Sequence, residues 1–219
     1  MAEFATYPPG TPSWVDLSTP DKATAKGFYG GLFGWGTVDP GPEAGGYELF
    51  TKSGKAVAGV GPLMMEGQPA AWTTFVCVDD ADEAAAKVRS AGGSVLAEPM
   101  DVLDQGRMAV FLDPTGGAFA VWQPRAHHGA ALANEPGTFC WNELQTRDTA
   151  VAASFYREVF GWDAHASDTD QMAYTEWKLG DATVGGMMDM PAEVPPEVPA
   201  YWLTYFAVDD CDATLARAT

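Results

Sequence analysis

The first pattern in the chain is an alternation of apolar and polar side chains. In residues 14–18, Val15 and Leu17 point to one face, and the other face receives Trp14, Asp16 and Ser18. Side chains alternate in this way along a β-strand, because successive residues point to opposite sides of the sheet. Residues 14–18 are therefore expected to form a strand whose two faces have different surroundings.

A helical period follows this strand. Apolar side chains recur at positions i, i+3, i+4 and i+7, which places on one helix face Ala25, Phe28, Tyr29 and Leu32. Thr19 is expected to cap this helix with Pro20 at its first position, and Gly34 to end it. The apolar face of the helix must pack against a sheet.

Further strands and a second, similar unit follow the helix. Strands are predicted around residues 47–50 and 56–60, separated by a turn at Ser53 and Gly54. The second unit has a strand at 73–78, a capping box from Asp80 to Glu83, a helix to Ala91, and final strands at 107–112 and 118–123. Each unit is expected to have the order βαβββ.

The chain also contains a longer internal repeat. Residues 14–35 match residues 141–162 without a gap, with 11 of 22 positions identical and every pair 127 residues apart. Residues 72–80 match 202–210 with an offset of 130, which a three-residue difference in a loop explains. The chain is therefore expected to contain two copies of the same domain.

The repeat defines the expected domain boundaries. The first domain is expected at residues 10–125, as two βαβββ modules, and a linker without periodicity at 126–136. The second domain is expected at residues 137–219 and, by comparison with the first, to stop before its last strands. The predicted fold class is α+β.

Composition and charge exclude several classes of partner. Lys and Arg total 12 against 30 Asp and Glu, so the net charge of −18 disfavours nucleic acid and anionic membranes. No apolar run has the length of a membrane span, and the first residues lack the order of a secretory signal. We therefore expect a cytoplasmic protein, either monomer or homodimer, with a small-molecule ligand. The three cysteines, which form no CxxC pair, are expected to be buried small hydrophobes: Cys77, Cys140 and Cys211.

Several motifs together resemble a known superfamily. These are the duplicated βαβββ unit, the FYxxxFGW helix end, the Val-Asp-Asp helix start and the hairpin FLDPTGGAFAVW. They resemble the vicinal-oxygen-chelate superfamily of glyoxalases, bleomycin-resistance proteins and dioxygenases, and most of all its tandem, two-domain actinobacterial members described as hydroxylase-like. The resemblance implies tandem modules paired into half-open eight-stranded barrels, with helices outside and a ligand cavity inside.

The metal ligands that the resemblance implies are missing from this sequence. Family enzymes hold a divalent metal with a His on the first strand and a Glu at the end of the last. Those positions fall on side chains that do not coordinate metals: Trp14 and Trp141, Thr73 or Trp72, and Ala120. The histidines lie elsewhere, with His127 and His128 in the linker, where we expect them to be solvated, and His165 after a helix. We therefore expect no metal, and the absence of a phosphate loop or nucleotide fingerprint suggests no other cofactor.

The inward face of each sheet supplies the candidate ligand contacts. An aromatic side chain beside a carboxylate suits a flat apolar ligand that carries a donor or a positive charge. The alternative is that Trp14 and Trp141 only fill the cavity while the acids face bulk water. Tyr47 and Tyr174 offer hydroxyls or simply belong to the core, and Arg107 either pairs with an anionic ligand or lies at the surface. The full set of candidate ligand contacts is Trp14, Asp16, Tyr47, Thr73, Phe75, Arg107, Trp122, Trp141, Glu143, Tyr174 and Tyr205.

Three functions follow from these observations. The sequence favours a metal-independent protein that binds an apolar or aromatic metabolite or antibiotic in the barrel cavity. The alternative is a hydroxylase-, isomerase- or lyase-like enzyme of the same fold, in which Asp16, Glu143 or a tyrosine transfers protons. A metal-dependent glyoxalase or dioxygenase is the least expected, and whether the chain is an enzyme at all stays open at this point.

Overall fold

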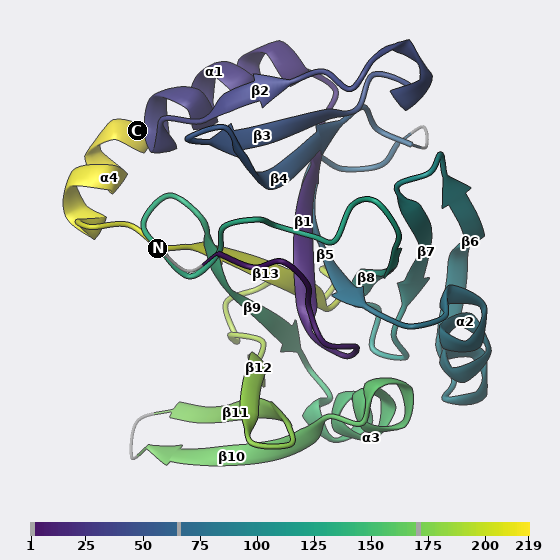
Figure 1. Ribbon diagram of the computed structural model, residues 1–219. Coiled ribbons are helices and arrows are strands. Elements are labelled where there is room, and N and C mark those ends of the chain that lie inside the picture. The colour runs from purple at the N-terminus through teal and green to yellow at the C-terminus, as the bar shows by residue number, and fades with distance from the viewer. Residues whose placement is uncertain (1–2, 65–66, 170–171) are drawn as a thin grey trace.

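The computed structural model describes residues 3–64, 67–169 and 172–219 (Figure 1). The first half of the chain contains β1 (Pro12–Ser18), α1 (Lys22–Phe33), β2 (Gly36–Val38), the short 3-10 helix η1 (Pro42–Ala44), β3 (Glu48–Lys52), β4 (Lys55–Gly61), β5 (Ala71–Cys77), α2 (Ala81–Ser90), β6 (Ser94–Val102), β7 (Gly106–Leu112) and β8 (Ala118–Pro124). The second half contains β9 (Phe139–Thr146), α3 (Thr149–Phe160), β10 (Asp163–Thr169), β11 (Met172–Leu179), β12 (Ala182–Asp189), β13 (Tyr201–Phe206) and α4 (Cys211–Ala218).

The strands form two sheets with the same core pairing. Within the described residues, one sheet has eight strands in the order β2-β3-β4-β1-β5-β8-β7-β6, and the other has five in the order β10-β11-β12-β9-β13. In the first sheet, β1 pairs antiparallel with β5 and parallel with β4; in the second, β9 pairs antiparallel with β13 and parallel with β12. This arrangement confirms the predicted α+β class and the tandem repeat.

The start of the first helix differs from the prediction. Asp21, not Thr19, caps α1, because its carboxylate accepts a hydrogen bond from the backbone N–H of Thr24 at 3.0 Å. The Thr19 hydroxyl accepts from the N–H of Asp21 instead. Pro20 therefore precedes the cap. The carboxylate reaches the free N–H groups of the first turn, while the hydroxyl closes the turn that leads into the helix.

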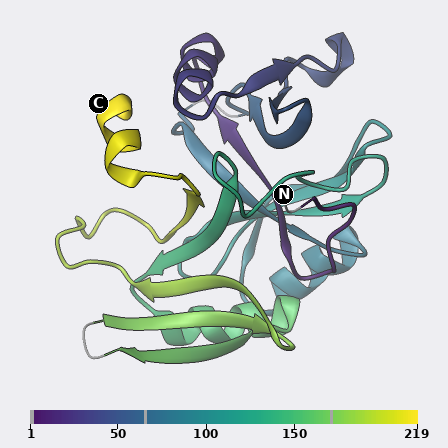
Figure 2. The ribbon, with the colours of Figure 1, turned by 60° about the vertical axis from the view of Figure 1, so that its left-hand side comes forward.

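The helices lie between the two halves of the chain. α1 contacts α4 and α2 contacts α3, and both views of the molecule show these two pairs (Figures 1 and 2). One buried apolar cluster accordingly joins residues of both halves, among them Val88, Phe119, Phe155 and Trp177. The apolar faces of α2 and α3 are covered by the other domain as well as by their own sheet, whereas, among the described helix residues, α1 buries only Ala25 and α4 buries none. None of the helices in the described part of the chain is long and apolar enough to cross a membrane.

Two equivalent tryptophans form hydrogen bonds between the two halves of the chain. The indole N–H of Trp162 donates to the carbonyl of Gly10 at 2.7 Å, and that of Trp35 donates to the carbonyl of Gly137 at 2.8 Å. The two donors lie 127 residues apart in the sequence, and so do the two acceptors. Each domain therefore donates to the segment that precedes the first strand of the other. The contact is reciprocal, and it fixes the two sheets relative to each other.

A buried polar cluster adds a second connection on one side only. The Tyr156 hydroxyl donates to Asp113 Oδ2 at 2.8 Å and accepts from Trp202 Nε1 at 2.8 Å. Asp113 is only 3% exposed. At the equivalent position of the first domain, Tyr29 accepts from Trp72 Nε1 at 3.0 Å. Tyr156 therefore satisfies a buried carboxylate of the other domain, whereas Tyr29 accepts a bond from within its own domain.

Tyr156→Phe is expected to lower the free energy of unfolding by about 2–3 kcal/mol, because it leaves a buried carboxylate oxygen and an indole N–H without partners. Tyr29→Phe is the matched control and is expected to cost about 1 kcal/mol or less. Denaturant unfolding followed by circular dichroism measures both. An equal or larger loss in Tyr29→Phe would contradict this account of the interface.

Candidate ligand site on the inner faces of the sheets

Strand register places the candidate residues of the first domain on one face of its sheet. Asp16 lies opposite Gly59 of β4 and Thr73 of β5, and Trp14 lies opposite Phe75. The pairing continues from β5 to β8 and β7, where the residues on the same face are Ala120, Trp122, Met108 and Val110. We call the faces that carry Trp14 and Trp141 the inner faces. Trp72, Val76 and Phe111 lie on the opposite, helix-covered face.

A hydrogen-bonded cluster lies on the inner face of the first domain. Trp14 Nε1 donates to the Tyr47 hydroxyl at 2.9 Å, and that hydroxyl donates to the Asp16 carboxyl. The Tyr47 ring crosses Gly59 so closely that a Cβ there would lie 1.8 Å from the hydroxyl oxygen. Glycine at position 59 is therefore what allows Tyr47 to reach both Trp14 and Asp16.

The second domain repeats the cluster at the same offset. Trp141 Nε1 donates to the Tyr174 hydroxyl at 2.7 Å, which in turn donates to Glu143. A Cβ at Gly186 would lie 1.8 Å from that hydroxyl oxygen, as at Gly59. We refer to the two sets, Trp14–Tyr47–Asp16 and Trp141–Tyr174–Glu143, as the first and second inner clusters.

The second inner cluster has more polar contacts than the first. Glu143 Oε1 also accepts from the Tyr205 hydroxyl at 2.9 Å and from Gln145 Nε2 at 2.5 Å. Gln145 is 5% exposed, and its Oε1 is buried without a protein partner. Burying an unpaired polar atom costs about 1–3 kcal/mol. This amide oxygen is thus a buried acceptor without a protein donor on the inner face.

Burial changes the proton affinity of the first cluster. It raises the pKa of Asp16 from 3.8 to about 7, and the hydrogen bond from Tyr47 offsets part of that rise. Burial, together with the nearby Asp16 carboxyl, also raises the pKa of Tyr47 well above 10.0. A carboxyl that titrates near neutrality can both donate and accept a proton, which is the property that acid–base catalysis requires.

The linker contributes a histidine to the first inner face, which the sequence did not predict. The His127 ring lies edge-on to Trp14, with centroids 4.5 Å apart and planes at 84°, and 5.6 Å from the Trp122 ring. Trp122 Nε1 donates to the His127 carbonyl at 2.8 Å, and His127 Nε2 is buried without a protein partner. Burial, followed by the positive charge of His128, lowers the pKa of His127 from 6.5 to about 4. The expectation of two solvated linker histidines was therefore wrong for His127, while His128 is exposed.

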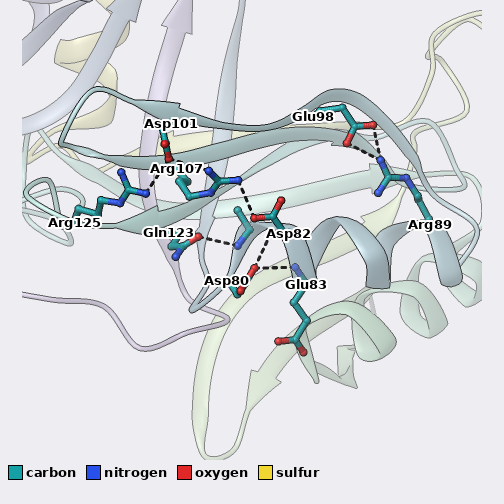
Figure 3. Close-up of polar contacts among 10 residues, drawn as sticks. Asp80, Asp82, Glu83, Arg89, Glu98, Asp101, Arg107, Gln123 and Arg125 are labelled. Carbon is teal, nitrogen blue, oxygen red and sulfur yellow. Dashed lines mark hydrogen bonds and ion pairs between the residues drawn. The ribbon is translucent and has the colours of Figure 1, made fainter.

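Arg107 does not face the inner clusters. Its side chain extends from β7 toward α2 and forms ion pairs of 2.8 Å with Asp82 and 2.9 Å with Asp101 (Figure 3). By register it pairs with Gln123, on the helix-covered face, and not with Trp122. Its position therefore agrees with the alternative of a surface arginine that stabilises the helix-to-sheet contact.

The remaining candidates lie on the inner faces but differ in exposure. Phe75 and Trp122 are buried and Thr73 is half-buried, whereas Tyr205 is 39% exposed opposite Trp141. Two surface hollows lie elsewhere. One, of about 440 Å³, separates the start of α2 from the end of α3; the other, of about 350 Å³, lies beside Arg147 and the loop before β13. Neither is lined by a residue of the inner clusters.

The inner faces do not fit a chelated divalent metal. Trp14, Thr73 and Ala120 occupy the positions where the resemblance implies ligands, and Trp72 lies on the helix-covered face, where it donates to Tyr29. Within residues 3–64, 67–169 and 172–219, no three His, Cys, Asp or Glu side chains converge in a way that could hold a metal ion. A divalent site requires several converging ligands, whereas each inner cluster contributes a single carboxyl group.

Comparison with known structures supports the architecture. A Mn(II)-bound glyoxalase from Novosphingobium aromaticivorans is similar with a TM-score of 0.64 and 17% identity, over 96% of this chain and 69% of that one. BphC, a halotolerant catechol dioxygenase, has a TM-score of 0.58 and 16% identity, over 83% of this chain and 65% of that one. At such identities the likeness concerns the fold alone.

Comparison of sequences identifies the family. The chain is 45% identical over 224 residues to "Putative glyoxylase CFP32" of Mycobacterium bovis and Mycobacterium tuberculosis, over 100% of this chain and 85% of those proteins. It is 42% identical over 235 residues to "Anthracycline biosynthesis protein DnrV" of Streptomyces peucetius, over 100% of this chain and 83% of that protein. The family model matches residues 11–121 and 126–219. The chain therefore belongs to the Glyoxalase/Bleomycin resistance protein/Dioxygenase superfamily.

Proposed function

We propose that the chain binds a small, flat, largely apolar molecule on the inner faces of its sheets without the help of a chelated metal. Each inner face supplies an indole and a phenol as an aromatic wall and one carboxyl as a polar contact. Ligand sites commonly combine such an apolar wall with a few fixed polar groups. We also propose one such site in each domain, with the domains at residues 10–125 and 137–219 joined by the linker 126–136.

The observation that carries this proposal is the duplicated tryptophan. Trp14 and Trp141 occupy the first-strand position where a chelating histidine is expected, and each donates its indole N–H to a tyrosine held over a glycine. Tryptophan offers a large rigid contact surface but no lone pair for a metal. The relative named for anthracycline biosynthesis supports the same class of ligand, because anthracyclines are flat aromatic molecules.

An enzyme of the hydroxylase, isomerase or lyase type is the second candidate. The observation in its favour is Asp16, whose pKa is raised by burial to about 7 beside the Tyr47 hydroxyl. A group of this kind could move a proton on a bound molecule. The relatives named as glyoxylases are also consistent with an enzyme.

Binding is tested with an anthracycline as the probe. Calorimetric titration is expected to show binding to the wild type, and Gly59→Ala and Gly186→Ala are expected to weaken binding at their own site about tenfold, because the new Cβ displaces the tyrosine. Gly31→Ala is the matched control, since no atom lies within 4 Å of its added Cβ. Variants with a wild-type circular dichroism spectrum and unchanged affinity would contradict the proposal.

The same titration separates the two candidate functions. Mass spectrometry of the recovered probe shows an unchanged compound if the chain only binds it. Conversion of the probe that is abolished by Asp16→Asn or Glu143→Gln supports the enzyme instead.

Metal removal is expected to have no effect. Purified protein should contain less than one equivalent of zinc, nickel, manganese or iron, and a chelator should change neither the thermal midpoint nor the binding of the probe, because the inner clusters lack converging ligands. One equivalent of metal whose removal abolishes binding would overturn the metal-free proposal.

Asp16 is expected to give the stability a defined pH dependence. The folded chain holds the Asp16 proton more tightly than the unfolded chain, so ionisation of this group lowers the free energy of unfolding as the pH rises from 3.8 to about 7. Asp16→Asn cannot ionise and escapes this loss. Denaturant unfolding at a series of pH values should therefore show that the free energy of unfolding of the variant rises relative to that of the wild type between pH 3.8 and about 7. A difference that does not change with pH would show that Asp16 ionises without cost.

A further inference from the structure

The linker holds His127 against the first inner face through contacts on both sides of the residue. The His127 backbone N–H donates to the Gln105 carbonyl at 3.0 Å, and the His127 carbonyl accepts from Trp122 Nε1 at 2.8 Å. Two residues later, Gly129 has φ 110° and passes so close to β1 that a Cβ would lie 2.6 Å from the Ser13 carbonyl oxygen. These contacts hold the linker backbone against the sheet, and the His127 ring there contacts Trp14 and Trp122.

The imidazole of His127 lacks a hydrogen-bond partner in the described protein for one of its nitrogen atoms in this position. Its ring contacts Trp14 and Trp122, but its Nε2 atom is buried and has no partner in the protein. Buried polar atoms in native proteins nearly always have a hydrogen-bond partner, and an exception calls for a missing one. The missing partner must come from outside the described protein atoms.

The surroundings define the chemistry of that partner. An uncharged imidazole nitrogen either donates or accepts, depending on its tautomer, and a hydroxyl group can satisfy both cases whereas a carbonyl can satisfy only one. Asp16 lies on the same inner face, linked to Trp14 through Tyr47, and the net charge of the chain is −18, so an anionic group is disfavoured. Trp14 and Trp122 are 3% and 7% exposed and their rings surround the imidazole with apolar surface, so an aromatic body suits the position beside the hydroxyl once the linker has moved.

We propose that His127 is a ligand-recognising residue of the first domain, and that its Nε2 forms a hydrogen bond with the hydroxyl of an uncharged aromatic molecule on the inner face. This inference rests on the proposed binding function and adds the substrate class and a linker residue to it. Because Nε2 has no exposed surface, binding requires residues 125–128, which have no regular secondary structure, to move from the sheet and to release the His127 N–H from the Gln105 carbonyl.

The test compares 2-naphthol with naphthalene, which differ only in the hydroxyl. Wild-type protein is expected to bind 2-naphthol about tenfold more tightly, as one buried hydrogen bond provides. His127→Phe keeps an aromatic ring against the tryptophans but lacks the nitrogen, so it should bind both probes equally. His128→Phe makes the same change at the exposed neighbour and should keep the tenfold preference. Dissociation constants from tryptophan fluorescence give these values.

A second measurement does not depend on any variant. In the wild-type protein, 2-naphthol should shift the His127 Nε2 signal in an imidazole nitrogen NMR spectrum, and naphthalene should shift it much less. Equal affinity for the two probes, an unchanged preference in His127→Phe, or an unmoved Nε2 signal would each overturn the inference and leave the proposed binding function standing. If neither probe binds and the anthracycline also fails to bind, both the proposed function and this inference are wrong.

Discussion

The structure depends on the burial of α2 and α3 between the two sheets. α2 and α3 pack against each other as well as on their own strands, and their apolar side chains join one core that crosses the domain boundary. The reciprocal donation from Trp35 and Trp162 to the carbonyls of Gly137 and Gly10 fixes the same arrangement through buried hydrogen bonds. With the helix-covered faces occupied in this way, the two hydrogen-bonded clusters lie on the opposite, inner faces, where Trp14 shares a buried apolar cluster with Leu132 and Ala133 of the linker.

Duplication has produced two inner clusters with one scaffold and different polar chemistry. In both copies an indole, a phenol and a carboxyl form a hydrogen-bonded row over a glycine that has no room for a side chain. Asp16 receives its bond from Tyr47 in a setting that raises its pKa, whereas Glu143 accepts from three side chains. The tryptophan, tyrosine and glycine that both copies share determine the shape of the inner face. The groups around each carboxyl determine the hydrogen bonds that this carboxyl forms.

Tryptophan stands at the two first-strand positions where the resemblance implies a metal ligand, and it has a different chemistry. A chelated metal ion presents a localised positive charge to a ligand, whereas an indole ring presents a large uncharged surface. Two buried side-chain atoms without a hydrogen-bond partner in the described protein, His127 Nε2 and Gln145 Oε1, lie near the first and second inner clusters respectively. Under the proposed function, such a surface would select ligands by shape and by a few hydrogen bonds rather than by the strength of a metal bond.

The sequence by itself determined the local periodicities and the repeat. The alternation in residues 14–18 and the offset of 127 gave the strands, the helices, the α+β class and the common face of Trp14 and Asp16, because these depend on side-chain period alone. The offset also paired Tyr47 with Tyr174, although it left open whether their hydroxyls serve a ligand or the core. Family resemblance then located the positions where metal ligands are replaced.

Only the tertiary structure decided how distant segments meet. Asp21 and not Thr19 caps the first helix because its carboxylate reaches the N–H of Thr24. Arg107 lies on the helix-covered face because its strand register places it opposite Gln123, and there it meets Asp82 and Asp101. His127 carries no periodic signal, since the linker has no regular structure, and its burial follows from hydrogen bonds to Gln105 and Trp122. Contacts between segments far apart in sequence depend on packing, and no local pattern encodes them.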